Sequence, residues 1–198
     1  MIGKIIAVVG APGCGKSTLV KKLAKHYNGI PVLEGEEKDY PKRIIDDMAN
    51  RNRNMELFVW WRNKLVTEML KARKLSAKGK VVIMDTFWLN NNTYIKAFFK
   101  GFEKEIMEDL SELDGKFLPR PDVILVLSAS ESKTKEFIKR RNRSFDTSKE
   151  FFVWVKIVHA EHQRIFKRIP HTLFVDRTEM DFDNEADLRK ITSAIDKL

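Results

Sequence analysis

The chain has 198 residues, of which 43% are hydrophobic and 33% charged, a balance typical of one globular domain and not of a disordered segment. No apolar run approaches the ~20 residues that a membrane span needs, so we expect no membrane partner. Lys and Arg outnumber Asp and Glu by 37 to 28, which fits polyanionic ligands such as nucleotides or nucleic acid and equally fits ordinary solubility charge. The single cysteine, Cys14, excludes an internal disulfide, and we expect a cytoplasmic protein.

Short apolar runs alternate with longer helical patterns along the chain. The first run, residues 3–9, is β-branched and leads directly into a glycine-rich turn, so it predicts a buried strand and not a signal peptide. Apolar strands that alternate with helices predict a parallel five-stranded sheet with helices on both faces, in an α/β domain that covers residues 1–198. Further strands are predicted at 31–33, 80–84, 122–127 and 172–175, and helices at 16–28, 54–76, 93–113, 131–141, 148–168 and 184–197.

The turn after the first strand carries the most specific motif. Residues 10–17 match the Walker A pattern G-x-x-x-x-G-K-S of a P-loop. Its glycines let the main chain approach a phosphate, and its N–H groups lie at the positive end of the following helix. Lys16 is expected to reach the β- and γ-phosphates of ATP, and the Ser17 hydroxyl to bind Mg²⁺. The predicted nucleotide-binding residues are Gly10, Ala11, Pro12, Gly13, Cys14, Gly15, Lys16, Ser17 and Thr18.

Two acids stand at the ends of predicted strands. Asp85 follows the third strand and is a candidate Mg²⁺ ligand beside Ser17, although Asp is also a common turn residue. Glu34 follows the second strand; it could take the proton from a hydroxyl during phosphoryl transfer, or belong to a solvated acidic turn. Because ligands bind beyond the carboxyl ends of parallel strands, we expect the P-loop and both carboxylates to share one cleft.

A basic helix near residues 133–143 ends in Arg140, Arg141 and Arg143. Guanidinium groups suit the charge on a transferring phosphoryl group. A solvated helix end, or a patch that binds DNA or RNA, would use the same residues.

Taken in chain order, these motifs resemble the deoxynucleoside kinase family, which is related to the thymidylate kinases. The resemblance implies a P-loop kinase that transfers the γ-phosphoryl group of ATP to the 5′-hydroxyl of a nucleoside. It implies that Glu34 is the general base, that Arg141 and Arg143 belong to a lid at about 139–147, and that Asp146 contacts the sugar 3′-hydroxyl. The residues that carry it are the P-loop, Val32-Leu33-Glu34, Phe58–Arg62, Ile83-Met84-Asp85-Thr86, Tyr94-Ile95, Pro121–Leu127, Arg141-Asn142-Arg143, Val158–Glu161 and Asp181-Phe182-Asp183.

Two departures from the family concern the phosphoryl acceptor. The family usually has an arginine after the third-strand acid, where this chain has Thr86. The family's base-reading glutamine has Trp60 or Trp61 at the nearest position, and one of these could stack on a base, with Arg62 beside it. We therefore expect a nucleoside kinase. A nucleoside monophosphate kinase is the alternative, a nucleic-acid-binding P-loop ATPase is the alternative of another class, and a homodimer is left open.

Overall fold

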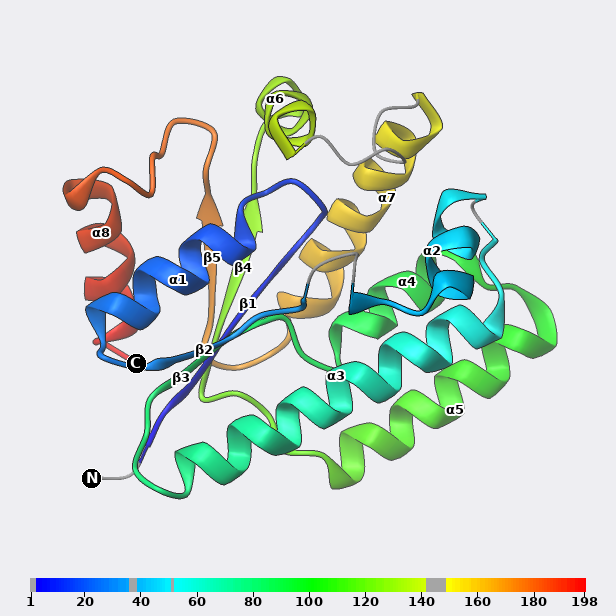
Figure 1. The fold of residues 1–198 in the computed structure, drawn as a ribbon, viewed down its shortest axis with the longest axis horizontal. Helices are drawn as coiled ribbons and strands as arrows, with labels where there is room; N and C mark the ends of the chain where they lie inside the picture. Colours follow the sequence, from blue (N-terminus) through cyan, green and yellow to red (C-terminus); the bar gives the residue numbers. More distant parts are fainter. Residues whose placement is uncertain (1–2, 36–38, 51, 142–148) are drawn as a thin grey trace.

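The computed structural model describes residues 3–35, 39–50, 52–141 and 149–198, and its centre is one sheet of parallel strands (Figure 1). The strand order is β2-β3-β1-β4-β5. Val8 pairs with Asp85 and Gly10 with Leu127, so the P-loop and Asp85 leave the sheet at the same edge. The predicted parallel five-stranded sheet is confirmed. The strands are β1 (Ile5–Gly10), β2 (Ile30–Val32), β3 (Val82–Asp85), β4 (Val123–Ser128) and β5 (Thr172–Asp176).

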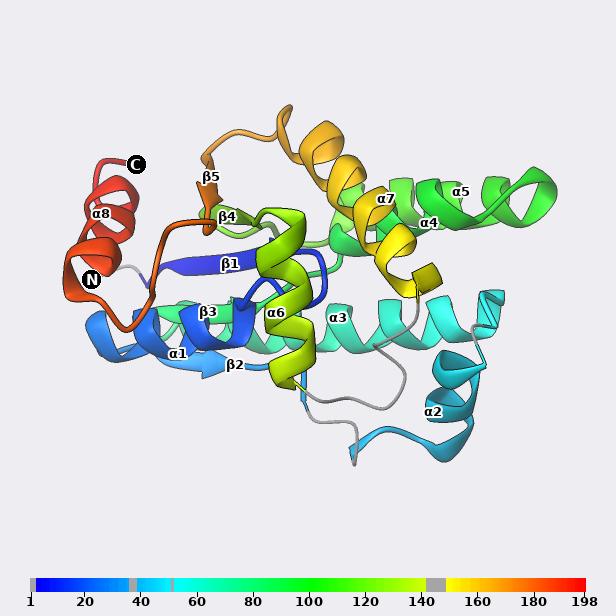
Figure 2. The same ribbon diagram turned by 90° about the horizontal axis from the view of Figure 1, so that it is seen from above.

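Helices cover both faces of this sheet. Figures 1 and 2 show α1 and α8 on one side and α3, α4, α5 and α7 gathered on the other, with α2 beyond them. The helices are α1 (Lys16–His26), α2 (Lys42–Ala49), α3 (Met55–Ser76), α4 (Asn90–Phe98), α5 (Gly101–Phe117), α6 (Glu131–Arg141), α7 (Lys149–Phe166) and α8 (Glu185–Ile195). None of the described helices is long and apolar enough to cross a membrane.

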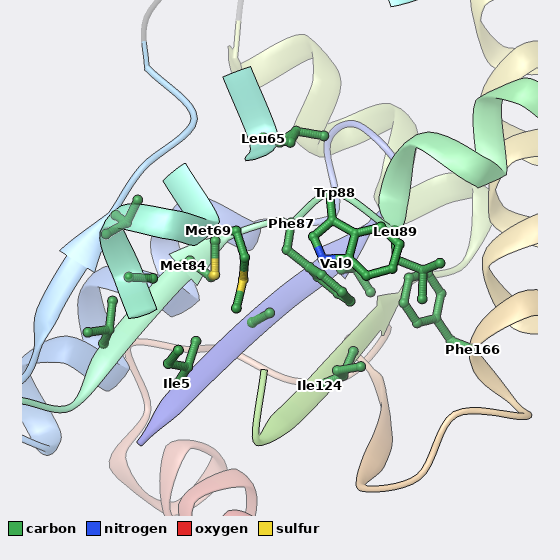
Figure 3. Packing of buried hydrophobic residues seen from close by; sticks show 14 of the residues in the cluster. Ile5, Val9, Leu65, Met69, Met84, Phe87, Trp88, Leu89, Ile124 and Phe166 are labelled. Carbon is green, nitrogen blue, oxygen red and sulfur yellow. The ribbon is translucent and has the colours of Figure 1, made fainter. Parts of the chain in front are cut away.

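Alternate residues of β1 enter two separate cores because side chains of a strand point to opposite faces in turn. Ile5 and Val9 pack with Met69 of α3 and Phe166 of α7, and the segment after β3 adds Phe87 and Trp88 to this core (Figure 3). Ile6 and Val8 pack on the opposite face against α1 and α8. Burial on both faces explains why these strands are continuous apolar runs without alternation.

Two sequence-based assignments differ from the structure. The single helix predicted over 93–113 is wrong: α4 ends at Phe98, and extended backbone at Phe99 and Lys100 separates it from α5. The break lets Phe99 pack edge-on against Phe58, with ring centroids 4.7 Å apart. Helix α2 was not predicted, because its eight residues are too few to display a clear helical period.

Candidate active site

The P-loop glycines have positive φ angles and close neighbours. Gly13 has φ 83°, and a Cβ atom there would lie 2.5 Å from Ile138 Cγ1 of α6. Gly15 has φ 88°, and a Cβ atom there would overlap with Nη1 of Arg177. A side chain at either position would strain the backbone and would force the side chain of Ile138 or Arg177 to shift. The loop is held against α6 and the segment after β5.

Arg177 packs against the P-loop and was missed by the sequence analysis. Its Nη1 donates a hydrogen bond to the carbonyl oxygen of Cys14 at 3.3 Å. Its guanidinium lies between the rings of Phe137 and Phe182, 4.3 and 4.2 Å from their centroids. Cation–π contacts on both faces fix this arginine beside the loop. Its position directly after the predicted fifth strand, at the same sheet edge as the P-loop, is the signal that could have found it.

Lys16 lies within the loop at the start of α1. Its Nζ donates hydrogen bonds to the carbonyl oxygens of Gly10 at 3.1 Å and Ala11 at 3.4 Å. Burial alone would lower the pKa of Lys16, but the Cys14 thiol and the carboxylates of Asp85 and Glu34 outweigh it and raise the pKa. The ammonium group therefore stays charged at the centre of the site, as binding of a phosphate requires.

Ser17 and Asp85, the two predicted Mg²⁺ ligands, lie side by side. The Ser17 hydroxyl donates a 2.5 Å hydrogen bond to Oδ2 of Asp85, while Oδ1 is buried and has no hydrogen-bond partner. A buried carboxylate oxygen without a partner is costly unless a ligand satisfies it. The described residues contain no group of three His, Cys, Asp or Glu side chains that could hold a metal by themselves. Mg²⁺ is usually bound through one or two protein oxygens with water and substrate phosphates, so this pair fits that ion.

A cavity of about 300 Å³ opens beside Lys16, between the P-loop, α3, α4 and α7. We call it the central cavity. Lys16 and Glu34 line it together, as predicted from the strand ends. Its volume suits a small molecule. The lining residues are Pro12, Lys16, Glu34, Met48, Arg53, Leu57, Phe58, Trp61, Leu65, Thr86, Asn90, Asn91, Tyr94, Phe98, Glu150, Phe151 and Trp154.

Tyr94 connects the polar and aromatic parts of the central cavity. Burial raises the pKa of the Tyr94 phenol to about 12, and the negative charge of Glu34 adds to this shift while Lys16 opposes it. Its ring lies 5.9 Å from that of Trp154 and 6.1 Å from that of Phe58. Tyr94 is therefore a neutral hydroxyl at physiological pH, next to the charged groups and within an aromatic wall.

The two consecutive tryptophans of α3 have different surroundings. Trp61 lines the central cavity, whereas Trp60 is not among the described residues that do. Both rings make edge contacts with Tyr40, with centroids 5.4 Å apart in each case. Of the two residues predicted to stack on a base, only Trp61 is among the described residues that line the central cavity, and the stacking role itself stays a prediction.

Arg62, the other predicted substrate contact on α3, is not among the described residues that line the central cavity and pairs with Asp114. Arg62 Nε donates a 2.7 Å hydrogen bond to Oδ2 of Asp114, and Nη2 bonds to Oδ1. Asp114 belongs to α5 and its side chain is only 7% exposed. A bidentate pair of this kind joins α3 to α5 and leaves Arg62 little freedom to reach a substrate.

Arg53 is the one arginine among the described residues that line the central cavity. It lies just before α3, and its guanidinium is 5.1 Å from the ring centroid of Trp154 and 5.6 Å from that of Phe98. The sequence analysis did not select it. Its neighbours come from α4 and α7, which are far away in the sequence, so no local pattern marked it.

Thr86, which replaces the family's arginine, also lines the central cavity. Its φ of 68° is unusual for a β-branched residue, and its hydroxyl oxygen is buried without a hydrogen-bond partner. Strained backbone of this kind is concentrated at functional sites. Thr86 thus places a hydroxyl group without a partner at the wall of the central cavity.

The predicted lid falls at the edge of what the structure describes. Arg141 ends α6. Its side chain, together with Arg143 and Asp146, lies outside the described residues, so their predicted roles stay predictions.

The comparisons with known proteins agree with this geometry. A family model described as an AAA domain matches residues 5–177. The chain belongs to this AAA domain family. The chain is 26% identical to a curated thymidylate kinase of Caldanaerobacter subterraneus subsp. tengcongensis over 183 residues. The alignment covers 86% of this chain and 85% of the relative.

Solved structures of two kinases have the same fold. A deoxyadenosine kinase from M. mycoides, solved with the products dCMP and dCDP, superposes with a TM-score of 0.79 at 16% identity and covers 98% of this chain and 100% of its own. A thymidylate kinase from Candida albicans gives a TM-score of 0.70 at 17% identity, covering 98% of this chain and 92% of its own. The predicted P-loop kinase fold and the resemblance to these two families are confirmed.

Proposed function

We propose that this protein is an ATP-dependent kinase that transfers the γ-phosphoryl group to the 5′-hydroxyl of a nucleoside. One observation carries the proposal: the P-loop lysine and the Glu34 carboxylate line the same aromatic cavity. Lys16 marks the end where the γ-phosphate would lie, and Glu34 is within the same space to take a proton. Trp61, Phe98 and Trp154 provide flat apolar surfaces of the kind that bind nucleobases. The use of ATP fits the cytoplasmic location expected from the sequence.

The roles of the residues follow from their positions. Glu34 would accept the proton of the 5′-hydroxyl as its oxygen attacks the γ-phosphorus, and the bond to the β–γ bridging oxygen would break to release ADP. Lys16 would hold the charge on the phosphate oxygens. Ser17 and Asp85 would hold Mg²⁺, which neutralises phosphate charge when bound. We retain Arg141 and Arg143 as lid residues and Asp146 as a sugar contact, as the family resemblance implies.

A nucleoside monophosphate acceptor is the second candidate, and Arg53 favours it. A monophosphate adds roughly two negative charges, which need a cationic partner beyond those that bind ATP. Arg53 is a guanidinium on the wall of the central cavity, and the curated relative is a thymidylate kinase. Replacing Arg53 by Met keeps the length of the side chain and removes the charge, so it separates the two candidates.

The test is a screen of phosphoryl transfer over nucleosides and their 5′-monophosphates, with the products identified by mass spectrometry. We expect at least one nucleoside to give its 5′-monophosphate, and Lys16→Ala to abolish the product without unfolding the protein. A preference for monophosphates that Arg53→Met removes would establish the second candidate. Hydrolysis of ATP without any phosphorylated product would contradict the kinase assignment, and salt-sensitive binding of DNA or RNA would then favour the nucleic-acid-binding ATPase.

A further inference from the structure

His162 is a buried histidine on α7 that does not line the central cavity itself. Its side chain is fully buried and stacks on the ring of Phe166, with centroids 5.9 Å apart. Nδ1 lies 2.9 Å from the backbone carbonyl oxygen of Val158. Nε2 lies 2.6 Å from the position of the side-chain oxygen of Asn90, a residue of α4 that lines the central cavity. His162 is therefore separated from the cavity by one side chain.

The hydrogen atoms of this group can be assigned from its partners. The Val158 carbonyl can only accept a hydrogen bond, so Nδ1 must carry the proton of the imidazole. Burial, together with the smaller effect of the charge on Lys16, lowers the pKa of His162 to about 3. The ring is thus neutral at physiological pH and has a single N–H group. Nε2 is left with a lone pair that faces Asn90.

The lone pair on Nε2 fixes the orientation of the Asn90 amide. The two ends of an asparagine amide have nearly the same shape, so the surrounding hydrogen bonds decide which end faces which partner. An amide oxygen facing Nε2 would bring two lone pairs together in a buried site. The NH₂ group must therefore point to His162, and the amide oxygen to the other side, where Asn90 lines the central cavity together with Tyr94.

We propose that His162 is a positioning residue that fixes the orientation of the Asn90 amide, so that this wall of the central cavity offers the lone pairs of the amide oxygen to the substrate. The proposal rests on the proposed function and adds a substrate class to it. The bound nucleoside or nucleotide must present a hydroxyl or an N–H group at this wall. A molecule that presents only an oxygen or a ring nitrogen without hydrogen would face lone pairs and bind weakly.

The first test measures the proton position and does not depend on activity. Nitrogen NMR of the full chain with labelled histidine distinguishes the two neutral forms and the charged form. The signals of His162 are assigned by their loss in His162→Gln, among the 4 histidines of the chain. We expect a neutral ring with the proton on Nδ1 from about pH 5 to pH 8. A proton on Nε2, or a ring that titrates in this range, would overturn the proposal.

The second test measures binding through quenching of tryptophan fluorescence, without ATP. The probes are deoxyadenosine, deoxycytidine and thymidine, each compared with its 3′-O-methyl and base N-methyl analogues, and the 5′-monophosphates of the same set. For wild type we expect the loss of one such donor to weaken binding roughly 10- to 100-fold, because a buried partner is left unsatisfied. Asn90→Leu and His162→Leu should reduce this ratio to about threefold or less.

Two variants separate positioning from folding. Glutamine can both donate to Val158 and accept from Asn90, so His162→Gln should restore the discrimination that His162→Leu loses. His159→Gln is the matched control, since His159 lies on the same helix and does not line the central cavity. Discrimination unchanged in folded His162→Leu would refute the proposal. If no probe bound to wild type, the proposed function and the substrate class would fail together, while NMR would still decide the role of His162.

Discussion

Arg62→Ala tests whether this arginine joins two helices, as the structure indicates, or binds the substrate, as the sequence suggested. The variant removes both hydrogen bonds to Asp114 and leaves a carboxylate that is only 7% exposed without its partner. Removal of one partner from a buried ion pair costs about 3–5 kcal/mol. The Arg62 side chain is 20% exposed, so water reaches the pair and we expect a loss of about 2–4 kcal/mol in the free energy of unfolding.

The measurement is thermal and urea unfolding, together with kcat and KM for the phosphoryl acceptor. In a domain of this length, 1 kcal/mol corresponds to a shift in Tm of about 2–4 °C, so we expect Tm to fall by roughly 4–16 °C. KM should stay within about twofold of wild type, because Arg62 does not line the central cavity.

Arg43→Ala is the matched control for this prediction. Arg43 pairs with Glu56 at the surface, where the two side chains are 69% and 52% exposed. A pair of this kind is worth about 0–1 kcal/mol, so Tm should barely change. The double variant Arg62→Met with Asp114→Leu should recover much of the lost stability, since neither charge is then left alone. A large rise in KM for Arg62→Ala with an unchanged Tm would refute the structural role and return Arg62 to the substrate site.

Three further predictions concern the site itself. Glu34→Gln should lower kcat by roughly two to four orders of magnitude with little change in ATP affinity, because it removes the proton acceptor. A variant whose only defect is a lower ATP affinity would instead make Glu34 part of the metal site. Trp61→Ala should raise the KM for the acceptor about tenfold or more, since base–aromatic stacking is worth about 1–3 kcal/mol. Trp60→Ala should change this KM much less, and equal effects of the two variants would contradict the assignment of Trp61. Gly15→Ala should destabilise the P-loop and weaken ATP binding, measured by calorimetry, because its φ is 88° and the new Cβ would meet Arg177; unchanged ATP binding would show that the loop can rearrange.

Local sequence patterns were sufficient for the phosphate end of the site. A P-loop consists of consecutive residues between a strand and a helix, so one stretch of sequence contains the whole cradle. Asp85 was placed correctly beside Ser17 because the ends of parallel strands meet at one edge. The same reasoning brought Glu34 to Lys16, although the catalytic role of Glu34 stays a prediction.

The wall of the central cavity could not be derived in this way, because it depends on how α3, α4 and α7 pack together. Helical periodicity does not show which of two neighbouring tryptophans meets a cavity, and only the packing selected Trp61. Charge alone did not distinguish Arg62 from Arg53. Arg62 bonds to the buried carboxylate of Asp114, which is far away in the sequence, whereas Arg53 packs against aromatic rings of α4 and α7. Asn90 and His162 meet across 72 residues of chain. The sequence thus determined the fold and the phosphate-binding motif, whereas long-range packing decided which side chains line the central cavity, because those contacts join residues that share no local pattern.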